Sequence, residues 1–261
     1  MRVPPNFDGD TARRFGAEAM IAARFLTRLP LGPAEPLEPG ALARASWAFP
    51  LIGAGIGIAC AIVYAAALSL AVPALVAALL AVLGGTLVTG ALHEDGLADM
   101  ADGLGGRDRD ARLAIMRDSR TGVFGVLALV FSVGLRAAAL SAVGTGWAAA
   151  AALIAAHAVG RGGVAVALYT LPAARTDGLG ASAGTPEPAI VGWALGITIL
   201  AAFAMLGWAA GLAALAPAAI AMTLIGETAR RQLGGQTGDV LGAIEQGGEA
   251  ATLIAAAAWA P

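Results

Sequence analysis

The sequence contains no lysine, only one cysteine and few charged residues. All 16 basic residues of the 261-residue chain are arginine, which we attribute to amino-acid usage in the source rather than to function. Cys60 has no second cysteine with which to form an intrachain disulfide bond. Only 13% of the residues are charged, against about 25% in a typical soluble domain. The chain therefore lacks the polar surface that a water-soluble particle of this size requires.

Hydrophobic residues make up 58% of the chain, and the mean hydropathy is +0.77. They gather into apolar segments of about the length that crosses a bilayer as a helix. These segments lie at 47–71, 74–92, 122–143, 147–170, 189–208, 210–226 and 239–259. We therefore predict an all-α fold, a polytopic transmembrane bundle of about six to seven spans that forms a single domain over residues 1–261.

The connections between the segments are short near Pro73, Gly144 and Gly207, so we expect three antiparallel helical hairpins. Glycines inside the segments allow close helix packing, and they would also permit a homo-oligomer. The last segment contains Glu245 and Glu249, which are costly in lipid. It is therefore expected either to span the membrane or to form a re-entrant or broken helix lining a cavity.

Residues 11–29 have the pattern of an amphipathic helix, with apolar side chains at helical spacing and several arginines and Glu18 among them. So many charges favour a helix that lies on the bilayer surface over one that crosses it. Arginines also precede the first span and occupy the loop at 93–120, whereas the loops after the first, third and fifth spans contain none. By the positive-inside rule, the N-terminus and residues 93–121 face the cytoplasm, which predicts a multi-pass protein of the bacterial cytoplasmic (inner) membrane.

Acidic residues are concentrated where the second span leaves the membrane. Asp95, Asp99 and Asp102 are spaced i, i+4 and i+7, so on a helix they share one face. Three ionised carboxylates this close would repel one another. Mg²⁺ would relieve that repulsion and retain waters for a substrate phosphate. We therefore predict a magnesium site on these aspartates, with Glu94 as an additional or orienting ligand.

The same segment ends in a basic sequence, Arg117-Asp118-Ser119-Arg120-Thr121. Arg117 and Arg120 are suited to two-point phosphate contacts, and Ser119 and Thr121 lie where the next helix begins and could add hydrogen bonds. An acidic metal site beside a basic phosphate site indicates phosphoryl or nucleotidyl transfer.

Other polar residues lie farther along the chain or before the first span. Asp239 opens the last segment and could complete the metal site, with Thr237 beside it. Arg161 lies inside an apolar segment, where it would either bind a substrate anion or pair with a carboxylate. Arg28 lies near the end of the amphipathic helix and could cover the site.

Four stretches of this sequence resemble the cobalamin synthase family, the adenosylcobinamide-GDP ribazoletransferases. They are FLTRLP at 25–30, HEDGLAD at 93–99 with ADG at 101–103, IMRDSRTG at 115–122 with FG at 124–125, and TGD at 237–239 with LGA at 241–243. Arg117 stands where a lysine is common in the family.

The resemblance implies that the 3′-hydroxyl of α-ribazole, or of its 5′-phosphate, attacks the cobinamide-linked phosphorus of adenosylcobinamide-GDP, releasing GMP with Mg²⁺ as cofactor. Asp102 or Asp118 would accept the hydroxyl proton, and Arg120 would hold phosphate at the reacting centre. The expected partners are these two small molecules and the lipid bilayer, with no nucleic acid.

Two alternatives belong to other families. A CDP-alcohol phosphotransferase also places aspartates at the cytoplasmic ends of membrane helices, but its motif requires an arginine where this chain has Asp99. A transporter could use Arg136, His157 and Arg161, yet the chain shows no convincing pair of repeated broken segments.

Overall fold

The computed structural model describes residues 9–32 and 38–260, and most of them are helical. The helices are α1 (Gly9–Leu26), α2 (Ala41–Ala45), η1 (Ser46–Ala48), α3 (Phe49–Ser69), α4 (Ala74–Thr89), α5 (Leu92–Gly103), α6 (Arg109–Ile115), α7 (Val123–Val143), α8 (Gly146–Thr170), α9 (Leu179–Ala183), α10 (Pro188–Leu206), α11 (Trp208–Leu233) and α12 (Gly238–Ala258). The described residues form no β-strand, only an isolated bridge between Ala173 and Gln236.

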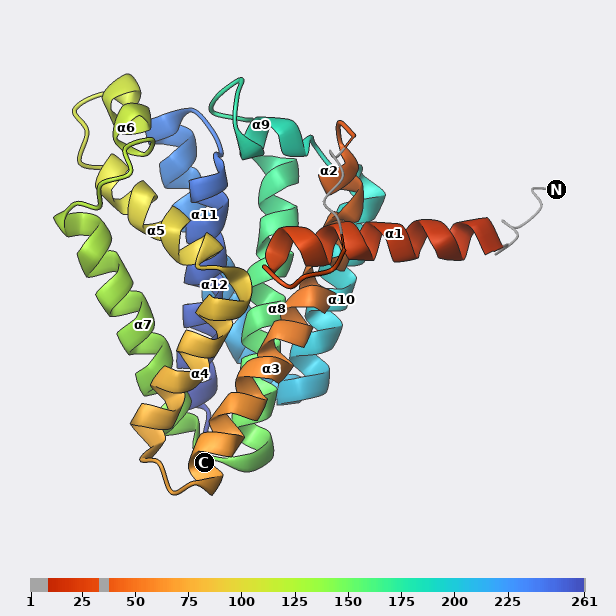
Figure 1. The fold of residues 1–261 in the computed structure, drawn as a ribbon, viewed down its shortest axis with the longest axis vertical. Helices are drawn as coiled ribbons and strands as arrows, with labels where there is room; N and C mark the ends of the chain where they lie inside the picture. The colour runs from red at the N-terminus through yellow and green to blue at the C-terminus, as the bar shows by residue number, and fades with distance from the viewer. Residues whose placement is uncertain (1–8, 33–37, 261) are drawn as a thin grey trace.

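Five stretches of helix are long and apolar enough to cross a membrane, or six if the bent pair of α4 and α5 counts as one span. They run roughly side by side along the long axis of the molecule (Figure 1). Large apolar side chains on their outer faces are well exposed; Ile62, Phe131 and Leu200 have exposed fractions of 63–67%. The prediction of an all-α, multi-pass membrane bundle is confirmed.

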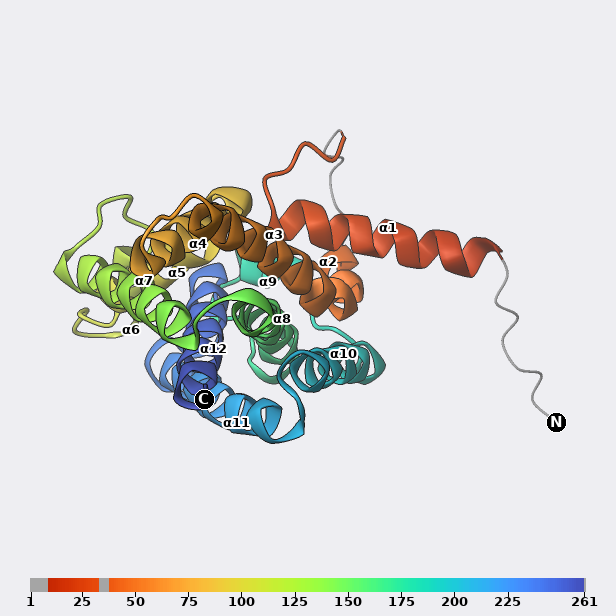
Figure 2. The same ribbon diagram turned by 90° about the horizontal axis from the view of Figure 1, so that it is seen from below.

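Helix α8 lies at the centre of this bundle, surrounded by the other long helices when seen along their axes (Figure 2). Glycines allow its neighbours to approach. A Cβ atom at Gly53 or Gly57 of α3 would lie against the α8 backbone, and one at Gly160 of α8 would meet Glu245 of α12. The close helix packing expected from the small residues is therefore present.

Helix α1 lies across the bundle, nearly perpendicular to the long helices (Figure 1). Its inner face is held by η1, because the Trp47 indole N–H donates to Glu18 Oε2 at 2.8 Å and the Trp47 ring meets Phe15 edge-on at 5.3 Å. Ala22 and Leu26 are fully buried. This orientation matches the predicted surface helix, which ends at Leu26 instead of residue 29.

The predicted second span, 74–92, is shorter than expected because α4 ends at Thr89 and the chain then bends by 93° into α5. Gly90 and Ala91 form the bend with φ angles of 68° and 61°. Left-handed backbone costs glycine nothing but is uncommon for alanine, so two successive residues of this kind break the helix sharply. The bend directs α5 away from the span.

The last segment, which could have been broken or re-entrant, is one continuous helix, α12. It packs against α5, α7, α8 and α11. Its polar residues keep it out of the group of helices that qualify as spans by composition. Packing inside the bundle, away from lipid, is what allows a helix with two glutamates at this depth.

Candidate active site

The aspartates predicted as metal ligands lie where α5 meets the beginning of α12. The two helices approach closely at a glycine: a Cβ atom at Gly96 would lie 2.9 Å from the Cα and carbonyl oxygen of Asp239. Asp95 and Asp99 flank this glycine on α5, and Asp239 begins α12. The fold thus brings together acids that are about 140 residues apart in the sequence.

Burial and the other carboxylates of this group shift the pKa of Asp99. Partial burial, followed by the charges of Asp95, Asp239 and Asp102, raises the pKa of Asp99 from 3.8 to about 6. Asp95 is exposed, whereas Asp99 and Asp239 are half-buried. This mutual repulsion is the electrostatic situation that a divalent cation relieves.

Asp102, predicted as a metal ligand or base, binds backbone amides at the start of α7. Its two carboxylate oxygens accept hydrogen bonds from the backbone amides of Gly122 at 2.6 Å and Gly125 at 2.8 Å. Asp102 therefore caps the amino end of α7 from the end of α5, as an N-cap residue does within one helix. The sequence spacing gave no sign of this role.

The oxygen chemistry of the cluster fits a hard cation such as Mg²⁺, which prefers carboxylate ligands. No three of these aspartates bring ligand oxygens within 4.8 Å of one another in the part of the chain that is described. Mg²⁺ usually keeps several waters and binds through one or two carboxylates, so the residues present fit an ion bound partly through water.

The basic residues of the 115–122 stretch lie at the surface beside this cluster. Arg117 donates to both oxygens of Asp177 at 2.7 and 2.8 Å, and Arg120 donates to Asp118 at 2.5–3.1 Å. Arg120 holds the pKa of Asp118 down at about 2, which makes Asp118 a weak proton acceptor. Ser119 and Thr121 are exposed.

A small recess of about 190 Å³ opens beside Asp239. Arg175 lines it and donates to Asp239 Oδ2 at 2.9 Å. The Thr237 hydroxyl also donates to Asp239 Oδ2, and it accepts the amide of Val240 as the N-cap of α12. Sequence reasoning missed Arg175 as a site residue; its isolation as the only arginine between α8 and α10 was the available signal.

A larger recess of about 530 Å³ opens beside Asp95. It lies where the end of α1 approaches the bend between α4 and α5, which both ribbon views show (Figures 1 and 2). Arg28 lines it together with Phe25 and Leu92. The backbone N–H of Arg28 donates to the carbonyl of Val88 at 2.8 Å, which fixes this segment against α4.

Glu94 and Arg161 are turned away from the aspartates into a buried ion-pair network. Arg136 of α7 donates to Glu94 Oε1 at 3.1 Å and to Glu249 Oε1 at 2.8 Å. Arg161 of α8 contacts both Glu249 and Glu245. Of the two roles foreseen for Arg161, its surroundings match carboxylate pairing: it is 2% exposed.

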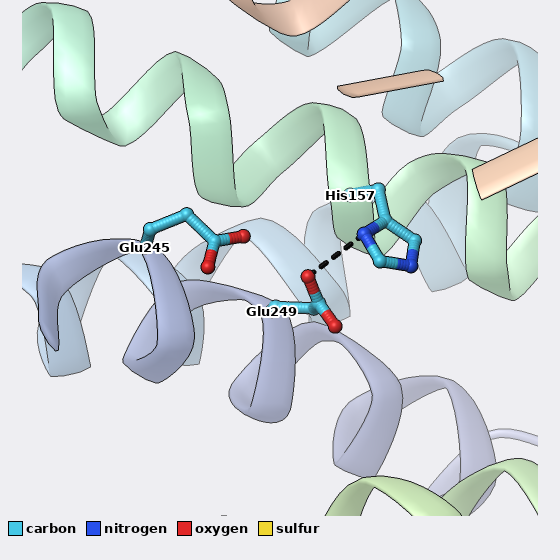
Figure 3. Close-up of side chains that lie close together, drawn as sticks. All are labelled: His157, Glu245 and Glu249. Carbon is cyan, nitrogen blue, oxygen red and sulfur yellow. Dashed lines mark ion pairs between the residues drawn. The ribbon is translucent and has the colours of Figure 1, made fainter. Parts of the chain in front are cut away.

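His157 approaches the same acids, and its Nδ1 lies 2.8 Å from Glu249 (Figure 3). His157, Glu245 and Glu249 are close enough together to hold a metal ion. However, the Arg161 guanidinium already contacts both glutamates, and Arg136 contacts one of them. We therefore interpret this group as an ion-pair network that joins α5, α7, α8 and α12.

Residues 18–257 match the family model described as cobalamin-5-phosphate synthase. The chain belongs to this family. A cobalamin-5-phosphate synthase relative from Bradyrhizobium diazoefficiens, named adenosylcobinamide-GDP ribazoletransferase, is 47% identical over 96% of each chain. Relatives with the same name from a Sinorhizobium species and from Azorhizobium caulinodans are 41% and 45% identical, over 97% and 92% of this chain and 97% and 95% of their own.

No solved structure matches this member of the cobalamin-5-phosphate synthase family. The resemblance inferred from the four sequence stretches is confirmed by the family match. Three of those stretches lie around one aspartate cluster, in α5, in the loop into α7 and at the start of α12. The remaining stretch, 25–30, lines the larger recess.

Proposed function

We propose that this protein transfers ribazole, or its 5′-phosphate, to adenosylcobinamide-GDP and releases GMP. Membership in the cobalamin-5-phosphate synthase family and the names of the relatives support this reaction. The observation that carries the proposal is the convergence of Asp95, Asp99 and Asp239 at one end of the bundle, next to arginines, with Asp95 lining one recess and Asp239 another.

In the proposed reaction, the 3′-hydroxyl oxygen of ribazole forms a bond to the cobinamide-linked phosphorus, and the bond from that phosphorus to the GMP oxygen breaks. Mg²⁺ held by Asp95, Asp99 and Asp239 would neutralise charge on the diphosphate. Arg117 and Arg120 exchange their exposed aspartate partners for phosphate oxygens. A carboxylate of the cluster takes the hydroxyl proton; Asp118 is poorly suited to this, because Arg120 holds its pKa at about 2.

The arginine distribution supports a cytoplasmic site in a bacterial inner membrane. The arginine-bearing connections, including α6, lie at the same end of the bundle as α5 and α9, while the α3–α4 turn lies at the opposite end (Figure 1). Donor and acceptor would therefore both reach the enzyme from the cytoplasm.

The test uses purified full-length enzyme with adenosylcobinamide-GDP, α-ribazole and Mg²⁺, following GMP release and the cobalamin absorption spectrum. Asp95→Asn and Asp99→Asn should each lower turnover at least about 100-fold. Asp110→Asn is the matched control, because Asp110 is an exposed acid on neighbouring α6. Full turnover without a divalent cation, or in both cluster variants, would refute the assignment.

A further inference from the structure

Two separate recesses reach the aspartate cluster. The larger contains Asp95, and the smaller contains Asp239. Displacement at phosphorus places the attacking and leaving oxygens roughly in line on opposite sides of the reacting atom. One recess should therefore receive the acceptor nucleoside, and the other should contact the leaving nucleotide.

Size distinguishes the two recesses. The larger measures about 530 Å³, within the range of roughly 300–1,000 Å³ that is usual for small-molecule sites. The smaller, at about 190 Å³, accommodates only part of a ligand. The larger recess therefore suits the ribazole nucleotide, the smaller of the two substrates, better than the smaller recess does.

The lining of the larger recess suits an aromatic nucleoside that carries a phosphate. Phe25 and Leu92 supply an apolar wall for the base, and Asp95 lies at the end nearest the cluster. Arg28 supplies a positive charge. The amino end of α5 also opens here, since Ala91 gives it no side-chain cap, and a helix end of this kind favours an anion.

Arg28 differs from the other arginines around the cluster. Arg117, Arg120 and Arg175 each bond to an aspartate. Across residues 9–32 and 38–260, no carboxylate or carbonyl oxygen bonds the Arg28 guanidinium, and the stem of this side chain lies over Gly90. Among the described residues, a ligand can therefore bind this charge without breaking an ion pair.

We propose that Arg28 binds the 5′-phosphate of the ribazole acceptor and makes the enzyme prefer the phosphorylated nucleoside. This inference rests on the proposed transferase function. The family description names a 5-phosphate product, whereas the relatives are named for ribazole. Arg28 is the side chain that distinguishes the two acceptors, because a charged hydrogen bond forms only with the one that has the phosphate.

The test compares kcat/KM for α-ribazole 5′-phosphate and for α-ribazole in wild type, Arg28→Met and Arg28→Lys. Arg28→Met should lower the value for the phosphorylated acceptor about 10- to 100-fold and change the value for α-ribazole less than about threefold. Arg28→Lys should restore part of the loss. Arg24→Met should behave as wild type, because the Arg24 guanidinium bonds the Leu31 carbonyl outside the recess.

Equal losses for both acceptors in Arg28→Met, or no loss for either, would overturn the assignment of Arg28. Equilibrium binding of α-ribazole 5′-phosphate to the detergent-purified enzyme gives the same comparison without turnover. Wild type should bind it at least tenfold more tightly than Arg28→Met. If wild type releases no GMP with either acceptor, the proposed function fails, whereas unchanged binding in the variant contradicts the phosphate site alone.

Discussion

Glu249 is the residue whose loss should most weaken the bundle. Its side chain is 2% exposed and joins Arg136 of α7 at 2.8 Å with Arg161 of α8 at 2.5 Å. Glu249→Gln preserves the shape of the side chain but removes its charge, so each arginine loses one of its two buried carboxylate partners, Arg136 keeping Glu94 and Arg161 keeping Glu245. Removing one member of a buried ion pair costs about 3–5 kcal/mol. Glu249 is paired with two arginines at once, so we expect a loss in this range although Glu94 and Glu245 remain beside them.

The assay is the apparent Tm of detergent-purified protein, followed by the fluorescence of its five tryptophans. At roughly 2–4 °C per kcal/mol for a chain of this size, the expected decrease is roughly 6–20 °C. Glu227→Gln is the matched control: Glu227 pairs with Arg230 and Arg231 on the outer surface of α11, and exposed pairs contribute little.

A double-mutant cycle sharpens this test. Arg136→Met should also lower the Tm, but the double variant should lose less than the sum of the single losses, because the two side chains contact each other. An apparent Tm of Glu249→Gln within about 2 °C of wild type would refute the reasoning. Strict additivity in the cycle would refute the contact on which it depends.

Three further predictions concern the end of the bundle that carries the aspartates and helix α1. Asp102→Ala should lower the apparent Tm because α7 loses two charge-assisted caps, about 1–3 kcal/mol in all, whereas exposed Asp95→Ala should not; equal Tm values would contradict the capping role. The Mg²⁺ concentration for half-maximal turnover should rise as pH falls through 6, because protonation of Asp99, whose pKa is raised to about 6, removes a ligand charge; a constant value from pH 7.5 to 5.5 would count against Asp99 as a ligand. Trp47→Phe should loosen α1, because it removes the hydrogen bond from the indole to Glu18. The expected result is faster proteolysis near Arg24, and an unchanged cleavage rate would disprove it.

The fold class could be predicted because apolar segments of bilayer length allow few structures other than helices. The ends of the individual helices were harder to predict from the sequence. The α4–α5 bend depends on Ala91 in a left-handed conformation, which the residue type disfavours and only the surrounding packing stabilises. Glu245 and Glu249 left open whether the last segment spans the membrane or is broken, because nothing local showed that Arg136 and Arg161 would face them from other helices.

The sequence alone determined the membrane bundle and the family, and it predicts the orientation from arginine placement and the residues that carry the chemistry. These are properties of composition, periodicity and local motifs. The tertiary structure decided which partner each of these residues contacts. It turned Asp102 to the end of α7, directed Glu94 and Arg161 into the buried network, brought Arg175 to Asp239 and left Arg28 in a recess beside Asp95. Each of these outcomes depends on contacts between residues distant in the chain, which only the packing of the helices specifies.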